Sequence, residues 1–172
     1  MPSKYLKKKT SKSRLPRSSE SGVWGGMSSH GVTPLHQVDG RLKSANYITV
    51  LQKTRLSAAS KLFPSGHWTL LQDKSLVHTS RETQAWISQR MGAVMPAVRF
   101  PPCSPDLNLI ENLWSVVQDK LGETKFTSVK GLWKVLRKTW NSVDPQNLDK
   151  LVSDMPRRMK LCLRAKAGHF TL

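Results

Sequence analysis

The segment from Ser104 to Trp114 constrains the fold of this chain more than any other part of the sequence. A turn marked by Pro105 runs directly into a stretch whose apolar residues recur at helical spacing. At about 100° per residue, Glu111 lies roughly 40° from Leu107, at the margin of the apolar stripe of the predicted helix. The stripe consists of Leu107, Ile110, Trp114, Val117 and Leu121.

A carboxylate at the margin of such a stripe has two interpretations. It can point along the core boundary toward a strand end, where a metal ion and water reach it, or it is an ordinary residue of the helix surface. Asp106, just before the helix, is most simply an N-terminal capping or dipole partner. Glu111 is therefore the candidate metal ligand of this segment.

A second candidate carboxylate, Asp73, follows the short apolar run Leu70-Leu71-Gln72. The run predicts a strand over residues 68–71, and ligands of open α/β sheets gather outside strand ends. Asp73 is accordingly a candidate metal ligand, and its alternative is a turn or helix-capping residue. His78 follows five positions later and either steers a substrate or caps the next helix.

Two candidate carboxylates in a strongly basic chain indicate metal-dependent phosphodiester chemistry. Two carboxylates within about 4 Å repel each other unless a divalent cation lies between them. Mg²⁺, or Mn²⁺ in its place, binds one or two protein carboxylates together with water and phosphate oxygens. The chain has 28 Lys and Arg residues against 11 Asp and Glu residues, a net charge of +17. Such a charge favours DNA or another polyanion as partner, although a basic chain can also bind polyanions without any specific activity.

Other classes of protein are disfavoured by the sequence. The two cysteines, Cys103 and Cys162, are far apart and have no partner at metal-ligand spacing, which indicates neither a disulfide framework nor a zinc site. The apolar runs are too short for a membrane span, and no apolar core follows the basic N-terminus as in a secretory signal. We therefore expect a reducing compartment and no membrane partner.

Residues 1–21 are predicted to form a basic flexible arm, because Lys and Arg stand there among Ser, Thr and Pro. The arm either contacts phosphates and directs import into the nucleus, or is a solvated tail. A predicted C-terminal helix over residues 157–166 is also basic. The candidate nucleic-acid-binding residues of the two segments are Lys7, Lys8, Lys9, Lys12, Arg14, Arg157, Arg158 and Lys160.

The pattern along residues 22–172 predicts an α/β domain with a helical C-terminal tail. We expect a hairpin of two strands over residues 23–38 and one or two helices over residues 44–62. Further strands are predicted over residues 68–71 and 94–100. Further helices are predicted over residues 81–90, 107–121, 125–142, 145–153 and 157–166.

Several parts of the chain resemble the catalytic domain of mariner-superfamily transposases, a branch of the ribonuclease-H-like fold. The Ser104–Trp114 segment resembles the block that ends in the third catalytic acid, here Glu111. Asp73 with His78 resembles the segment of the second catalytic aspartate. The remaining segments are residues 4–8 with 23–28, similar to the lead-in and second strand, and residues 155–159 with 165–169, similar to the C-terminal end.

The resemblance implies a mixed sheet flanked by helices and metal-dependent DNA cleavage and strand transfer, the chemistry of DNA transposition and integration. Mg²⁺ or Mn²⁺ would be held by Asp73, Glu111 and a first aspartate. In the family that aspartate belongs to a strand that precedes residues 4–8, so we expect the first strand and first acid to be missing. We therefore expect residues 22–172 to be a partial catalytic domain, inactive alone, in the nucleus.

Three functions stay open on this basis. The chain is a metal-dependent DNA transposase domain, a repurposed DNA-binding protein without catalysis, or a relic without function. The first would act on DNA together with a second copy of the chain or a full-length transposase.

Overall fold

The computed structural model describes residues 21–54, 58, 60–66, 68–90, 107–122 and 124–164. Five of the predicted phosphate-binding residues, the predicted strand over residues 94–100, Asp106 and Cys103 lie outside these ranges. The boundary predicted between residues 21 and 22 stays a prediction. Contacts divide the chain into two compact units, one with residues up to Gly25 and from Thr33 to Cys103, the other with Gly26–Val32 and residues from Ser104 onward.

The predicted hairpin is formed as two short antiparallel pairs of strands. In the first unit β1 (Ser21–Trp24) pairs with β4 (His36–Asp39), with Gly22 opposite Val38. In the second unit β2 (Met27–Ser28) pairs with β3 (Gly31–Val32). Glycines at positions 25 and 26 and Pro34 interrupt the hairpin, because glycine weakens a strand and proline lacks the N–H that a ladder needs.

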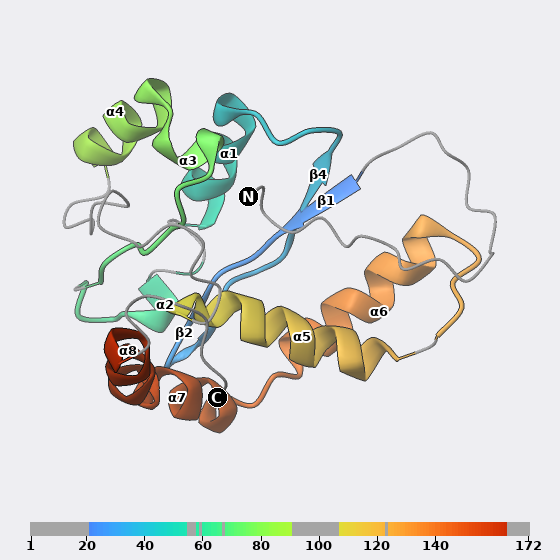
Figure 1. The fold of residues 1–172 in the computed structure, drawn as a ribbon. Helices are drawn as coiled ribbons and strands as arrows, with labels where there is room; N and C mark the ends of the chain where they lie inside the picture. Colours follow the sequence, from blue (N-terminus) through green and yellow to red (C-terminus); the bar gives the residue numbers. More distant parts are fainter. Residues whose placement is uncertain are drawn as a thin grey trace. The chain divides into compact units, whose positions relative to one another are not determined.

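Four helices lie in the described residues of the first unit. These are α1 (Ser44–Thr54), α2 (Ser60–Leu62), α3 (Leu76–Thr79) and α4 (Arg81–Arg90). Its core consists of Val38, Leu42, Tyr47, Leu51 and Ile87, with Trp24 and Trp68 packed against it. Helices α1, α3 and α4 contact one another and lie side by side in this unit (Figure 1).

The strand predicted over residues 68–71 was wrong for the described residues, which form only a single bridge at Leu70 before an extended segment. Leu70 and Trp68 pack on the core, whereas Leu71 is 51% exposed. A short apolar run predicts burial, but by itself it does not specify the ladder of hydrogen bonds that a strand also needs.

The second unit contains the hairpin β2–β3 and the helices α5 (Leu109–Leu121), α6 (Val129–Asn141), α7 (Pro145–Ser153) and α8 (Met155–Arg164). Helices α5 and α6 pack along each other (Figure 1). Ser128 caps α6 by accepting a hydrogen bond from the Gly131 N–H, so this helix begins four residues later than predicted. The core of the unit consists of Leu113, Val117, Leu121, Leu136, Trp140 and Leu148.

Helix α5 is amphipathic as predicted, but its buried side includes Leu113, which the predicted stripe left out, whereas Ile110 and Trp114 of that stripe are only partly buried. Leu113, Val117 and Leu121 are buried, and Gly122 ends the helix with a positive φ of 54°. Leu107 lies in the turn before the helix and is nevertheless buried. Within the described ranges, no helix is long and apolar enough to cross a membrane.

Candidate metal and nucleic-acid-binding site

Asp73 lies in the extended segment that leads into α3 and is held in a fixed orientation. Its Oδ1 accepts a hydrogen bond from the backbone N–H of Ser75 at 2.9 Å, the geometry of an Asx-turn. The same oxygen lies 2.6 Å from Nδ1 of His78. Asp73 therefore forms the turn that the sequence analysis gave as the alternative to metal binding. Both bonds use the same oxygen, Oδ1.

The carboxyl group of Asp73 is only partly screened from solvent, with 30% of its side chain exposed. Burial raises its pKa, but hydrogen bonds from the His78 side chain and the Ser75 N–H outweigh burial, so the pKa lies below its usual range. The ionised form is the one that ligates metal. Asp73 is therefore ready to bind a cation at neutral pH.

His78 is buried, with 7% of the residue exposed, and its ring is fixed by contacts of its own. The ring of Tyr47 lies against it with a centroid distance of 4.5 Å. The Tyr47 hydroxyl donates a hydrogen bond of 2.7 Å to Gln72, and Gln84 donates one of 2.6 Å to the His78 carbonyl. Burial, followed by the charge of Asp73, raises the pKa of Tyr47, which keeps its hydroxyl a donor.

These contacts give His78 a role that the sequence analysis missed. It neither caps a helix through its side chain nor stands exposed to a substrate, but orients the Asp73 carboxylate through Nδ1. The signal in the sequence was the spacing of five positions between Asp73 and His78, which brings the first turn of α3 back over the preceding turn.

Glu111 lies in the first turn of α5, where the helix dipole favours a negative charge. Its residue is half-buried, and its Oε2 atom is buried. The next residue, Asn112, accepts a hydrogen bond of 3.0 Å from Nη1 of Arg158, which ties this turn of α5 to α8. The first turn of α5 is thereby fixed within the second unit.

The two predicted metal ligands belong to different units, Asp73 to the first and Glu111 to the second. Each carboxylate is a hard oxygen donor of the kind that Mg²⁺ and Mn²⁺ prefer. Among the described residues, no group of three or more His, Cys, Asp or Glu side chains could hold a metal. Each carboxylate, taken by itself, therefore has the donor chemistry of a ligand for a magnesium-like ion, with water and phosphate as further ligands.

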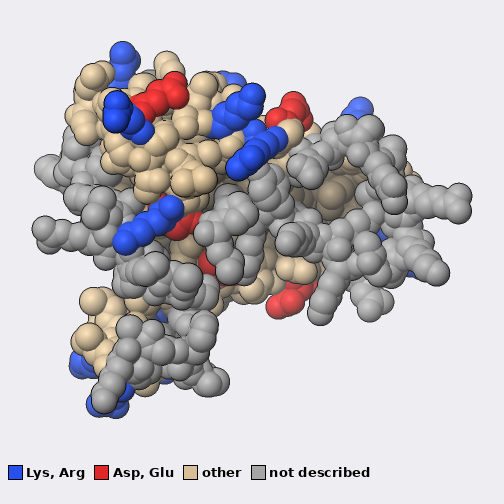
Figure 2. All heavy atoms as spheres, turned by 45° about the horizontal axis from the view of Figure 1, so that its top comes forward, with Lys and Arg blue, Asp and Glu red and all other residues tan. Residues whose placement is uncertain are grey.

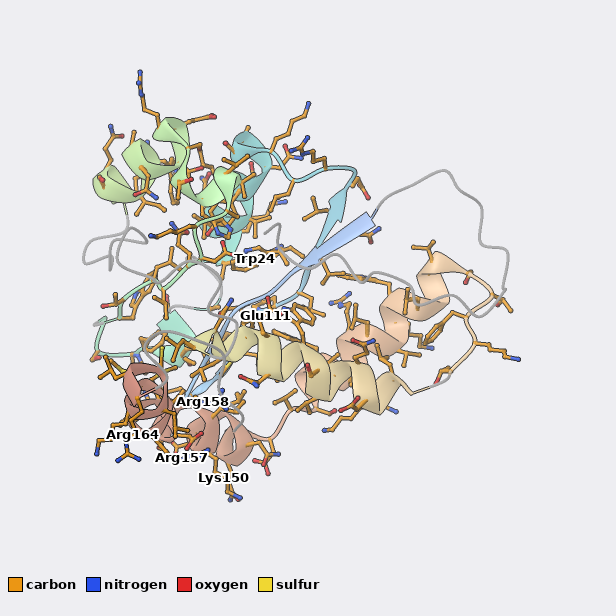
Figure 3. The ribbon with its side chains drawn as sticks, viewed as in Figure 1. Trp24, Glu111, Lys150, Arg157, Arg158 and Arg164 are labelled. Carbon is orange, nitrogen blue, oxygen red and sulfur yellow. The ribbon has the colours of Figure 1, made fainter. Side chains whose placement is uncertain are left out.

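The predicted phosphate-binding residues of α8 differ in their surroundings (Figure 3). Arg157 is exposed, but its guanidinium forms two hydrogen bonds with Asp154, at 2.6 Å and 3.0 Å. Arg158 is 4% exposed and donates to both Asp154 and Asn112. Lys160 is exposed. Hydrogen bonds from Arg157 lower the pKa of Asp154 and raise that of Arg157, as expected for an engaged pair.

Comparison with known proteins yields one family and several relatives. The family model described as "DDE superfamily endonuclease" matches residues 7–133. The transposable element Tc1 transposase of Caenorhabditis elegans is 27% identical over 83% of this chain and 51% of its own length. The Tcb1 transposase of Caenorhabditis briggsae is 30% identical over 84% of this chain and 51% of its own length. The chain thus spans about half the length of these relatives.

Solved structures of Mos1 mariner transposase share the fold. The catalytic domain matches with a TM-score of 0.78 and 19% identity, over 88% of this chain and 76% of that chain. The paired end complex with Mn matches with a TM-score of 0.80 and 21% identity, over 94% of this chain and 48% of that one. These matches confirm the predicted ribonuclease-H-like α/β class.

Proposed function

This chain belongs to the DDE superfamily endonuclease family, and we propose from this premise that it is the catalytic part of a Tc1/mariner-type DNA transposase. Its reaction is the cleavage of DNA phosphodiester bonds at element ends and the transfer of those ends to a target. The observation that carries the proposal is the Asp73 carboxylate, which His78 and the Ser75 N–H fix and whose pKa these hydrogen bonds lower.

Asp73 and Glu111 are the proposed ligands of Mg²⁺ or Mn²⁺. The ion would activate water or a 3′ hydroxyl and stabilise charge at the reacting phosphate. His78 and the Ser75 N–H hold the carboxylate of Asp73 in one rotamer, so that no ordering of this ligand is required when the ion binds. The Arg158 bond to Asn112 fixes the turn of α5 that carries Glu111.

DNA is the proposed substrate and partner, in agreement with the net charge of +17. Structures of Mos1 transposase include paired-end and strand transfer complexes. By analogy we propose assembly on DNA with a second copy of the chain or with a full-length transposase. The nucleus is the proposed compartment, because the substrate is there and the basic residues 1–21 suit an import signal.

A second candidate is DNA binding without cleavage. It is favoured by the engagement of Asp73 in an Asx-turn and with His78, since such a pair also has a purely structural use. The two candidates differ in metal dependence: only the transposase requires Asp73 and Glu111 to act on DNA.

The experiment that separates them measures nicking of supercoiled plasmid in Mg²⁺ and in Mn²⁺. The proposed activity predicts nicking by the unaltered chain that is lost in Asp73→Asn and in Glu111→Gln, with DNA binding retained in both. Asp149→Asn is the matched control, because Asp149 is an exposed acid on α7. Nicking that survives in either site variant would contradict the role of that residue as a metal ligand. Salt-sensitive DNA binding without any metal-dependent nicking would contradict catalysis by this chain alone and favour the second candidate.

A further inference from the structure

Helix α6 carries a row of cations on one side, which we name the α6 basic stripe. It consists of Lys130, Lys134, Arg137 and Lys138. At about 100° per residue these four positions fall within roughly 100° of the helix circumference. All four side chains are exposed. The opposite side is anchored by Leu136 and Trp140, which are buried, so the stripe faces solvent by necessity.

The α6 basic stripe differs from Arg157 and Arg158 of α8 in having its charges available. On α8, Arg157 and Arg158 both donate to Asp154. No cation of the stripe forms a hydrogen bond or ion pair with any described residue, and α6 contains no acidic residue. On the face shown in Figure 2, by contrast, Lys and Arg side chains lie among Asp and Glu side chains. An unpaired row of one sign gives up no internal ion pair when it binds an anion.

The stripe runs toward the end of α5 that carries Glu111. The rings of Trp114 and Trp140 stack with a centroid distance of 4.7 Å. Trp140 belongs to the last turn of α6, and Trp114 follows Glu111 by less than one turn of α5. Arg137 and Lys138 therefore lie on the part of α6 that packs beside the first turns of α5, and Lys130 lies at the far end.

The length of the stripe suits a nucleic-acid backbone. From Lys130 to Lys138 the rise is about 12 Å, at about 1.5 Å per residue. Duplex DNA carries one negative charge per about 1.7 Å of its axis, so a segment of this length presents roughly seven phosphates. The four cations, spread over about two turns of the helix, can pair with the phosphates on the near side of the duplex.

We propose that the α6 basic stripe binds the sugar–phosphate backbone of duplex DNA and guides it toward Glu111, without reading its sequence. The location relative to Glu111 rests on the proposed function, whereas the binding itself does not. None of the phosphate-binding residues predicted from the sequence lies on this helix.

The test compares two triple variants with equal loss of charge. In the stripe variant Lys130, Lys134 and Arg137 become Gln. In the control variant Lys43, Lys61 and Arg81, three exposed cations of the first unit, become Gln. Gln has a helix propensity close to those of Lys and Arg, so both variants should keep the helical content and Tm of the unaltered chain.

Binding to a short DNA duplex of arbitrary sequence is followed by fluorescence anisotropy over a range of salt concentrations. Each lost phosphate contact lowers the slope of log K against log salt by about 0.9, so the stripe variant should lose about 2.7 and the control variant less than 1. Equal losses in the two variants would overturn the proposal. So would a stripe variant that keeps its DNA slope but no longer binds vesicles of anionic lipid.

The nicking assay distinguishes this proposal from the proposed function. Binding that depends on the stripe, in a chain that never nicks DNA, would refute catalysis by this chain alone and leave the DNA surface standing. Nicking that depends on Asp73 but is equally strong in the stripe and control variants at moderate salt would refute the surface and leave the enzyme standing.

Discussion

Nδ1 of His78 and Oδ1 of Asp73 lie 2.6 Å apart. The ring of Tyr47 packs against the imidazole, with 4.5 Å between the two ring centroids. A carboxylate that already accepts hydrogen bonds from His78 and the Ser75 N–H cannot rotate freely. These contacts preorient the carboxylate that we propose as a metal ligand, and they lead to the first two predictions.

Loss of the His78 donor should weaken metal binding without removing a metal ligand. Partners of this kind typically contribute 10–100-fold to affinity, so we expect His78→Ala to weaken Mn²⁺ binding by about that factor. His78→Asn, whose amide nitrogen can occupy the place of Nδ1, should recover part of the loss. Titration of Mn²⁺ followed by electron paramagnetic resonance measures both. Equal affinity in the Ala variant and the unaltered chain would show that His78 does not orient the ligand.

The lowered pKa of Asp73 predicts a pH-dependent contribution to stability. A carboxyl group whose pKa is lower in the folded state stabilises the fold above its unfolded pKa, which is 3.8 for a model aspartate. That contribution disappears as the pH falls through the folded pKa. The difference in the free energy of unfolding between the unaltered chain and Asp73→Asn should therefore shrink from pH 6 to pH 3. Urea unfolding at the two pH values measures it, and a difference that grows on acidification would contradict the sign.

Trp140 should be the most costly single truncation of the second unit. It is fully buried and stacks on Trp114. Truncation of such a residue leaves a cavity, and we expect Trp140→Ala to lower the free energy of unfolding by about 3–5 kcal/mol. Trp140→Phe should cost clearly less, because most of the volume and the ring contact remain. Urea denaturation monitored by circular dichroism would show a small effect of Trp140→Ala if α6 were not packed on α5.

Two adjacent arginines of α8 should behave in opposite ways. Arg158 is buried and bridges Asp154 to Asn112, so Arg158→Ala leaves polar groups without their donor and should cost about 1–3 kcal/mol. Arg157→Ala removes an exposed partner of the same Asp154 and should leave the unfolding midpoint nearly unchanged. Thermal unfolding of both variants measures the two midpoints. Equal midpoints would show that Arg158 does not connect α8 to α5.

The sequence by itself determined the elements whose signals are local. The apolar stripe around Glu111 predicted α5, and the pattern over residues 145–153 predicted α7, because helical periodicity depends on residues a few positions apart. The Ser104–Trp114 segment also carried the resemblance that the family match and the shared fold later supported.

Only the tertiary structure decided which side chains are engaged and which are available. Arg157 and Arg158 look alike in a basic helix, yet one is exposed and the other is buried against Asn112, 46 positions earlier. His78 is held by Tyr47 as well as by Asp73, and the run over residues 68–71 forms a single bridge at Leu70 rather than a strand. Burial and pairing depend on contacts between distant parts of the chain, and no local pattern of residues specifies them.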